Sequence, residues 1–515
     1  MTTSSTASTT NPRRDAAALT AICLVALMFG LEISSVPVIL PELERVLHAD
    51  FQDAQWIMNA YTLACTSVLM AAGTLADRYG RRRVLVASLW LFGMASLACG
   101  WATSAPLLIA ARFVQGVGAG TMMICQFAIL SQQFREPAAR SRAFAVWGVV
   151  AGIGLGFGPL VGAAIVALAD WRWVFLVHAP LALLTLGLVH ASVQESRDPD
   201  AHRLDVAGML TLTLAVFALV YFITLGTVQG FGNRVGLALL AGALAFLALF
   251  VAAERRSAHP MFDFSVFRIH RFNGAMMGSV GMNLSFWPFM IYLPIYFQSA
   301  LGHDLMHSGW ALLAYTLPTL LVPPLAERLA LRHGAERVIP GGLGLMAVAF
   351  LLMAAGNARG VDAVVITACL AAGVGLGLTN SPVTNTSTGA VSAARAGMAS
   401  GIDFSARLIT LALSIALMGF VLVSGIARHL GEAGLRAGAG ELLQLAQGVA
   451  AGKLDIVPDA AAPALAQAAL RQGFGDVMLY AGVGVGLLAL ASHAFFRRGR
   501  RSVGLVPVGA DADLG

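Results

Sequence analysis

Two charged residues lie inside long apolar runs, where little water can solvate a charge. Glu32 lies in the run 17–40, nine residues before Pro41, and Arg112 is seven residues into the run 105–130. At 1.5 Å per helical residue, both side chains are expected about 10–13 Å from one end of their helices. Burying an acid at that depth costs about 2.5–3.5 kcal/mol, and apolar surroundings favour its protonated form. A carboxyl group that gains and loses a proton is suited to proton coupling.

A buried guanidinium needs a partner, so we hypothesise that Arg112 pairs with deprotonated Glu32 in one state of the molecule. Two simpler interpretations stay open. Glu32 could be a protonated acid held by a hydrogen bond, and Arg112 could be held statically by backbone carbonyl groups.

A second acid and base, Asp403 and Arg407, lie four residues apart in the run 398–424. That spacing places them on one face of a helix, where they can neutralise each other. The alternative is a second titrating site or part of a gate.

Other chemistry finds no support in the sequence. The five cysteines lie within apolar runs without metal-ligand spacing, and we find no nucleophile set or nucleotide-binding loop. We therefore predict a protein that is not an enzyme and that needs no metal or cofactor.

The elements that position these residues are predicted to be membrane-spanning helices. Of the 515 residues, 58% are hydrophobic and only 12% are charged, against about 25% charged in soluble domains. About 20 apolar residues cross a bilayer. We count fourteen such runs, at 17–40, 54–76, 84–103, 105–130, 143–168, 173–193, 206–227, 234–253, 272–298, 308–329, 338–357, 361–385, 398–424 and 474–496. The fold class is therefore an all-α polytopic membrane protein.

The positions of the arginines predict the orientation. Basic residues collect in loops on the side of both chain ends, including Arg78, Arg81, Arg82, Arg83, Arg497, Arg498, Arg500 and Arg501. The positive-inside rule then places both termini in the cytoplasm. The loop 425–473 lies on the other side, and 441–449 within it is a candidate short helix.

An internal repeat divides the chain into two halves. The segment 73–84 reads GTLADRYGRRRV and 327–338 reads ERLALRHGAERV, with six of twelve positions identical at an offset of 254. Two six-helix bundles moving about a central site form a transporter architecture. We predict these parts: a disordered cytoplasmic tail at 1–16, an N-terminal bundle at 17–193, an inserted helix pair at 194–254, a C-terminal bundle at 255–496, and a tail at 497–515.

Five motifs in order resemble the major facilitator superfamily, and in particular its fourteen-span drug:proton antiporters of EmrB/QacA type. Their residues are Glu32 and Ser34 through Pro41; Gly73, Asp77, Arg78, Gly80, Arg81 and Arg82; Arg112, Gln115, Gly116 and Gly118; Gly154, Gly156, Gly158, Pro159 and Gly162; and Trp171 through Pro180. The resemblance covers roughly 17–496. This chain departs from it at Glu32, where Asp is usual, and at Pro37 and His178, where Asn is usual; Asp403 also stands where Asn is usual.

The resemblance implies roles for two of these motifs. The second motif is a gate whose acid, Asp77, contacts the start of the run 398–424, although its arginines could be only positive-inside anchors. The fourth is the antiporter motif, whose glycines make a tight interface with the run 308–329 that controls leakage; ordinary close packing is the alternative.

Aromatic and polar residues in the runs are the candidates for a substrate pocket. Aromatic rings beside an acid suit lipophilic cations. The candidates are Glu32 itself, Asn59, Tyr61, Gln115, Gln126, Trp147, Phe286, Trp287, Tyr292, Tyr315 and Asn380.

We therefore expect a proton-coupled efflux transporter of the bacterial cytoplasmic membrane that exports amphipathic, mostly cationic compounds. It would use the proton gradient and contact substrates, protons and lipids but no nucleic acid. We expect a monomer, with envelope efflux proteins as optional partners. Export of one specific metabolite, such as a siderophore or an antibiotic, is the alternative, and a receptor without transport is a third, disfavoured by the buried acid and base.

Overall fold

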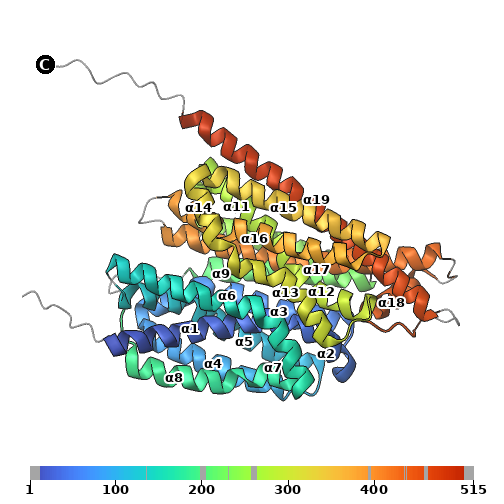
Figure 1. The fold of residues 1–515 in the computed structure, drawn as a ribbon, viewed down its shortest axis with the longest axis horizontal. Helices are drawn as coiled ribbons and strands as arrows, with labels where there is room; N and C mark the ends of the chain where they lie inside the picture. Colours follow the sequence, from blue (N-terminus) through green and yellow to red (C-terminus); the bar gives the residue numbers. More distant parts are fainter. Residues whose placement is uncertain are drawn as a thin grey trace, which may run out of the picture.

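The protein is a long bundle of helices, described here from a computed structural model (Figure 1). The structure describes residues 12–134, 136–197, 205–229, 231–256, 264–391, 396–433, 435, 438–456 and 462–503. The predicted tails lie mostly outside the described residues. Where they are described they are helical, because the first helix begins at Pro12 and the last ends at Val503.

The first group of helices follows the first six apolar runs. Its long members are α1 (Pro12–Ser35), α3 (Phe51–Tyr79), α4 (Arg81–Gly100), α5 (Ala105–Gln133), α6 (Pro137–Leu168) and α8 (His178–Ser192). Short pieces connect them: η1 (Pro37–Ile39), α2 (Leu40–Leu47) and α7 (Arg172–Leu176).

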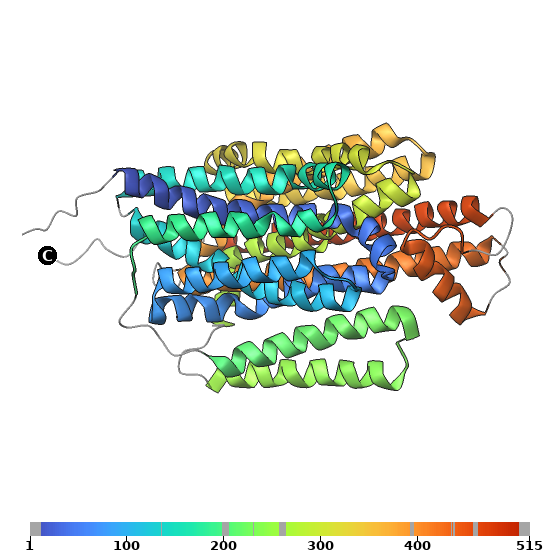
Figure 2. The same cartoon turned by 90° about the horizontal axis from the view of Figure 1, so that it is seen from below.

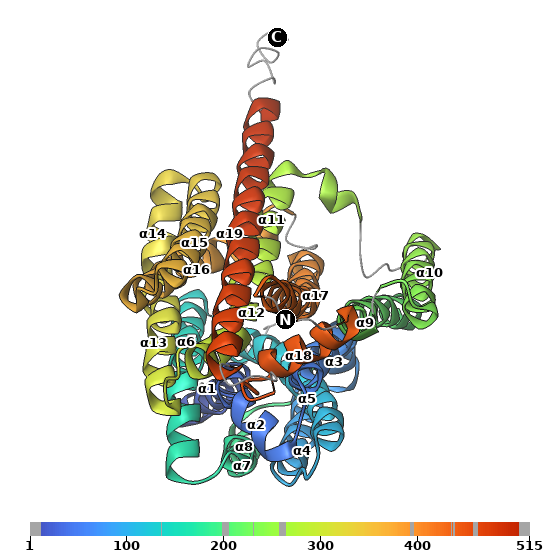
Figure 3. The ribbon, with the colours of Figure 1, turned by 90° about the vertical axis from the view of Figure 1, so that its right-hand side faces the viewer.

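The inserted pair is a hairpin of α9 (Val206–Gln229) and α10 (Arg234–Arg256), which lies along one side of the bundle (Figures 2 and 3). α9 packs on α3 and on α17 (Ala396–Glu432), which belong to different groups of helices. α10 packs on α9 and keeps most of its apolar side chains exposed, as a lipid-facing helix does.

The second group begins with η2 (Phe264–Arg268) and ends with the longest helix. Its members are α11 (His270–Leu284), α12 (Phe286–Ile295), the π-helical η3 (Tyr296–Ala300), α13 (Leu305–Leu321), α14 (Pro323–His333), α15 (Ala335–Arg359), α16 (Asp362–Gly389), α17, α18 (Ala439–Ala450) and α19 (Ala462–Val503).

Within the described residues, twelve helical segments are long and apolar enough to cross a membrane, and the bent pair α13 and α14 makes a thirteenth. The start of α1 and the end of α19 lie at the same end of the bundle, which we call the terminal end; the other is the distal end (Figures 1 and 2). The fold is thus an all-helical membrane protein.

Three boundaries differ from the sequence predictions. Regular helix ends at Ser35 rather than residue 40, because the chain turns into η1 at Pro37, whose ring has no N–H to continue the helix. The run 308–329 is broken into α13 and α14 at an angle of 46°, next to Pro323. The loop 425–473 is largely helical, and α18 occupies the predicted short helix.

The repeated segments adopt the same turn. Gly80 joins α3 to α4 with φ 109°, and Gly334 joins α14 to α15 with φ 85°. L-residues with side chains rarely adopt these angles, so glycine is required in both copies.

The two groups of helices contact each other along α6 and α13 and along α3 and α17. At the distal end, the Gln55 amide donates a hydrogen bond of 2.9 Å to the Tyr292 hydroxyl, which in turn donates to the carbonyl of Ile415. Gln298 donates to the carbonyl of Val38 at 3.0 Å. These bonds tie the distal ends of the two groups together.

Candidate functional site

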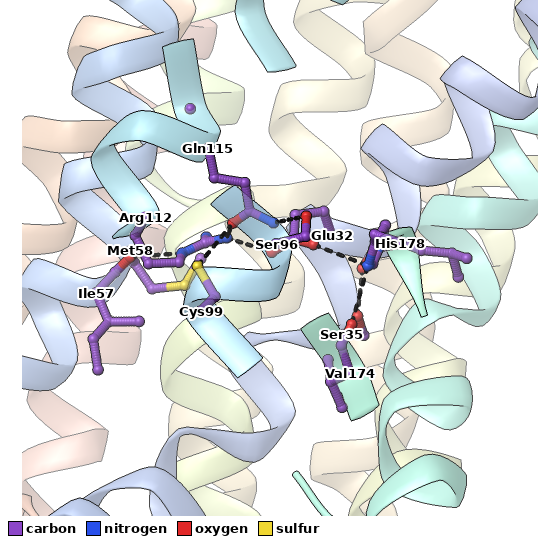
Figure 4. Close-up of polar contacts among 12 residues, drawn as sticks. Glu32, Ser35, Ile57, Met58, Ser96, Cys99, Arg112, Gln115, Val174 and His178 are labelled. Carbon is purple, nitrogen blue, oxygen red and sulfur yellow. Dashed lines mark hydrogen bonds and ion pairs between the residues drawn. The ribbon is translucent and has the colours of Figure 1, made fainter. Parts of the chain in front are cut away.

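Glu32 and Arg112, the two residues hypothesised to pair, meet in the core of the first group (Figure 4). Arg112 Nη1 donates to Glu32 Oε1, and neither side chain is exposed to solvent. Glu32 comes from the last turn of α1 and Arg112 from the third turn of α5. The two helices present one acid and one base to each other in the buried core of the first group.

Further polar contacts hold the guanidinium in place. Arg112 Nε donates to the carbonyl of Ile57 at 3.1 Å, and Nη1 also donates to Gln115 Oε1 at 2.6 Å. The Gln115 amide then donates to Ser96 Oγ at 2.9 Å. The Tyr61 ring lies 4.3 Å from Arg112 Cζ, a cation–π distance.

In this arrangement, a proton that binds Glu32 would replace its ion pair with Arg112. A buried ion pair gains from attraction but loses hydration, so its net contribution is small, whereas losing one partner is costly. When Glu32 takes up a proton, its attraction for Arg112 falls and the guanidinium becomes a buried charge without an anion. Proton binding therefore changes the energy of the whole packing around α1 and α5.

A histidine completes the environment of the acid. His178 Nδ1 lies 3.3 Å from Glu32 Oε2 and 3.1 Å from the carbonyl of Val174. His178 is the first residue of α8, and its side chain is buried. In the sequence, this residue stands out only as a departure from the usual Asn.

Asp403 and Arg407 form a second polar cluster, between α11, α16 and α17. Arg407 Nη2 is 3.0 Å from Asp403 Oδ2, and the Ser279 hydroxyl donates to Asp403 Oδ1. Arg407 also donates to Asn380 Oδ1 at 2.6 Å and to Thr384 Oγ1 at 2.9 Å. The two residues lie within salt-bridge distance, as mutual neutralisation requires, and a second titrating site stays the alternative.

The candidate pocket residues do not gather around one space. Tyr61 and Gln115 belong to the Arg112 cluster, Asn380 to the Arg407 cluster, and Tyr292 to the contact between the two groups. Asn59 is fully buried, and neither polar atom of its side chain has a hydrogen-bond partner.

The other aromatic and amide candidates form two separate contacts. Trp147 Nε1 donates to Gln126 Oε1 at 3.0 Å between α6 and α5. Phe286 stacks on Tyr315 with ring centroids 4.0 Å apart, and Trp287 meets Phe286 edge to face. Phe286 is equivalent to Glu32 in the internal repeat, so the second group has an aromatic stack at the position where the first group has an acid.

The glycine motif on α6 divides between two neighbouring helices, whereas the prediction placed all of its glycines against one. A Cβ atom at Gly154, Gly158 or Gly162 would meet α1, at Leu27, Ser34 and Ser35, rather than the run 308–329. Gly156 of the same motif, with Gly152 before it, faces α13 in that run, so part of the motif makes the predicted interface. Successive helical residues turn by 100°, so stripes two positions apart face different helices. Pro159 lies within α6 and does not end it.

The predicted gating motif is described in part. The Asp77 side chain lies outside the described residues, Gly73 lies on α3, and Arg78 is exposed beside the Tyr79 ring. Backbone N–H groups of Arg82 and Arg83 donate to Glu195, at 3.1 and 3.2 Å, and Arg81 donates its N–H to the carbonyl of Ser196. The segment after α8 thus caps the first turn of α4, because the Glu195 carboxylate lies at the N-terminus of that helix.

Sequence reasoning missed the polar neighbours that complete the clusters: Ser96, Ser279 and Thr384. Serine and threonine are common inside membrane helices, where they bond to their own backbone, so their presence in a run gives no signal. For His178 there was a signal, namely an ionisable side chain within a predicted span.

Similarity to known proteins agrees with this fold. The family model of the Major Facilitator Superfamily matches residues 22–415. The chain belongs to this superfamily. Among superfamily relatives, Multidrug resistance protein Stp of Mycobacterium tuberculosis (strain CDC 1551 / Oshkosh) is 33% identical over 78% of this chain and 75% of the relative.

Another relative, the Puromycin resistance protein pur8 of Streptomyces alboniger, is 32% identical over 81% of this chain and 83% of that protein. A bacterial homologue of the human lysosomal transporter Spinster, solved in an inward-facing and occupied conformation, superposes with a TM-score of 0.64. That alignment covers 95% of this chain and 98% of the solved one at 16% identity, and supports the superfamily fold alone.

Proposed function

We propose that this protein is a proton-driven efflux transporter that exports amphipathic, mainly cationic compounds. The observation that carries the proposal is the fully buried pair of Glu32 and Arg112 in the first group of helices. A structural protein gains little from such a pair, because hydrophobic packing would serve as well. A proton-coupled transporter needs a carboxyl group that is stable in both protonation states.

The proposed cycle uses Glu32 as the proton acceptor. A proton entering from the outer side neutralises Glu32 and weakens its hold on Arg112, and a bound cation is released outward. After the protein turns inward, Glu32 gives up the proton, and the restored pair favours binding of the next cation. The ion pair in the structure corresponds to the deprotonated state.

The relatives support the efflux direction. Stp is named as a multidrug resistance protein, and the chain matches most of its length. We further propose that the protein is of the fourteen-span EmrB/QacA type. The fourteenth span, beyond the thirteen apolar candidates, would be α3, which has 29 residues and packs on α5. The arginine distribution favours the cytoplasmic membrane with the terminal end in the cytoplasm.

The two groups would act as rocking bundles, with α9 and α10 as an inserted pair. The bundle of 17–193 would carry the proton site and the bundle of 255–496 the Asp403–Arg407 pair. Protons, substrates and lipids are the proposed partners of a monomer that needs no cofactor.

Export of a single metabolite is a second candidate. The relative pur8 is named for resistance to one compound, puromycin. The two candidates differ in substrate range, so efflux assays with several unrelated cations separate them.

The proposal is tested by efflux of ethidium from preloaded bacterial cells that express the protein. Wild type should lower cell fluorescence, and collapsing the proton gradient should stop it. Glu32→Gln should be inactive, because it keeps the shape of the side chain but cannot release a proton. Equal gradient-dependent efflux by both proteins would refute the role given to Glu32.

A further inference from the structure

One of the two carboxylate oxygens of Glu32 accepts no hydrogen bond. Oε1 accepts the hydrogen bond from Arg112, whereas Oε2 has no hydrogen-bond partner although the side chain is fully buried. A buried polar atom without a partner is costly, so it needs an explanation. His178 Nδ1, at 3.3 Å, faces this oxygen.

The protonation of His178 follows from its contacts. A carbonyl oxygen only accepts hydrogen bonds, so the 3.1 Å contact with Val174 places the ring proton on Nδ1. The other ring nitrogen, Nε2, is buried and has no hydrogen-bond partner. With the ring proton on Nδ1, the unpartnered Nε2 is the atom of the ring that can accept a further proton.

We propose that His178 relays the proton to Glu32. The incoming proton binds Nε2 and converts the ring to imidazolium. The ring then releases its Nδ1 proton to Oε2, so an N–H bond breaks and an O–H bond forms. The ring ends neutral with its proton on Nε2, Nδ1 accepts a hydrogen bond from the new O–H, and the pair has gained one proton. The reverse sequence releases it.

Nε2 of His178 and Oε2 of Glu32, both buried without a hydrogen-bond partner, are the two ends of this path, and the imidazole ring lies between them (Figure 4). An imidazole can carry a proton in this way because it gains one at one nitrogen while losing one at the other. An amide such as Asn cannot, although it fits a similar space.

Other titratable groups around Glu32 do not offer the same path. Arg112 on α5 approaches Oε1 and stays charged. Three other titratable groups interact electrostatically with both Glu32 and Arg112, namely Tyr61 and Cys65 on α3 and Cys99 on α4. They pack on the Arg112 side of the pair. His178 on α8 is the group that faces the free oxygen.

This inference rests on the proposed function of Glu32, and one experiment separates the two. Purified full-length protein is mixed rapidly with acid in the presence of a pH-indicator dye, and proton uptake is followed over time. Glu32→Gln should take up one proton fewer than wild type. His178→Asn should take up the same total as wild type, but at least about tenfold more slowly for that one proton, because general acid–base groups accelerate transfer by that much or more.

An unchanged proton count in Glu32→Gln would refute the proton site itself. A loss in Glu32→Gln together with wild-type speed in His178→Asn would refute only the relay. His178→Gln, which also cannot relay, serves as a second variant and should behave as His178→Asn does.

The wild-type protein gives an independent measurement if neither variant folds. Ring nitrogen NMR of histidine-labelled protein should show, among the eleven histidines, one neutral ring whose proton moves from Nδ1 to Nε2 across the pH range of uptake. The absence of any such change would overturn the relay.

Discussion

Arg112 and Glu32 bind each other with no part of either side chain exposed to solvent. The guanidinium has a carbonyl and an amide oxygen as further acceptors, whereas the carboxylate depends on Arg112 for its hydrogen bond. The acid is therefore the less stable partner when the pair is broken, and its protonation is the expected response.

Removal of the base tests this dependence. In Arg112→Gln, deprotonated Glu32 loses its cation, so Glu32 should stay protonated and efflux should lose its normal pH dependence. Breaking a buried pair costs about 3–5 kcal/mol, so the purified variant should also unfold at lower temperature. The double variant with Glu32→Gln should recover part of that stability. A wild-type pH profile in Arg112→Gln would contradict the coupling.

The close contact between α6 and α1 predicts an effect of one methyl group. A Cβ atom at Gly158 would overlap Ser34 Oγ, two residues after Glu32. Gly158→Ala should push α1 away, lower stability by about 1–3 kcal/mol and reduce ethidium efflux. Gly148→Ala on the same helix is the matched control, because nothing lies within 4 Å of its Cβ. Similar thermal unfolding and efflux in the two variants would count against this packing.

The distal contact between the two groups depends on one hydroxyl. Tyr292→Phe removes the bonds with Gln55 and Ile415 but keeps the ring. Two hydrogen bonds of about 0.5–1.5 kcal/mol each total about 1–3 kcal/mol, which corresponds to roughly a 5- to 150-fold change in the population of the separated state. A cysteine introduced as Ala54→Cys, buried in this region, should react correspondingly faster with a membrane-impermeant maleimide.

The control for this labelling is Tyr296→Phe, which removes a hydroxyl bonded to Asn357 within the second group. It should leave the labelling rate of Ala54→Cys unchanged. Equal rates in the Tyr292→Phe and Tyr296→Phe backgrounds would show that the Tyr292 hydroxyl does not hold the distal ends together.

The second charge pair should respond differently from the first. Asp403 is held by Arg407 and Ser279, and Arg407 has Asn380 as a further partner. Asp403→Asn should therefore keep the pH midpoint of efflux, whereas Arg407→Gln, which leaves a buried carboxylate, should destabilise the protein by about 3–5 kcal/mol. Efflux as a function of pH and thermal unfolding check these outcomes. A shifted midpoint in Asp403→Asn would make Asp403 a second titrating site.

Much of the fold follows from the sequence, because a bilayer leaves few options. Apolar runs of about 20 residues must become helices, and the repeated segments predict equivalent turns, as Gly80 and Gly334 show. The approach of Glu32 to Arg112 was also predictable, since their depths match and a buried charge needs a counter-charge.

The contacts between helices depend on how each helix is rotated about its axis and on where helices break. The lengths of the apolar runs do not reveal either. The glycine stripe of Gly154 and Gly158 faces α1 because of the rotation of α6 about its axis. His178 reaches Glu32 because α8 packs on α1 with this side chain turned toward it. Interhelical hydrogen bonds such as Ser279 to Asp403 follow from those placements.

The central claim is that Glu32 exchanges a proton for a cation. The most direct measurement uses purified protein in liposomes that contain a pH-indicator dye, with an ethidium gradient as the only driving force. Wild type should move protons against the ethidium flow, and Glu32→Gln should move none above empty liposomes. Proton movement by Glu32→Gln at the wild-type rate would contradict the account.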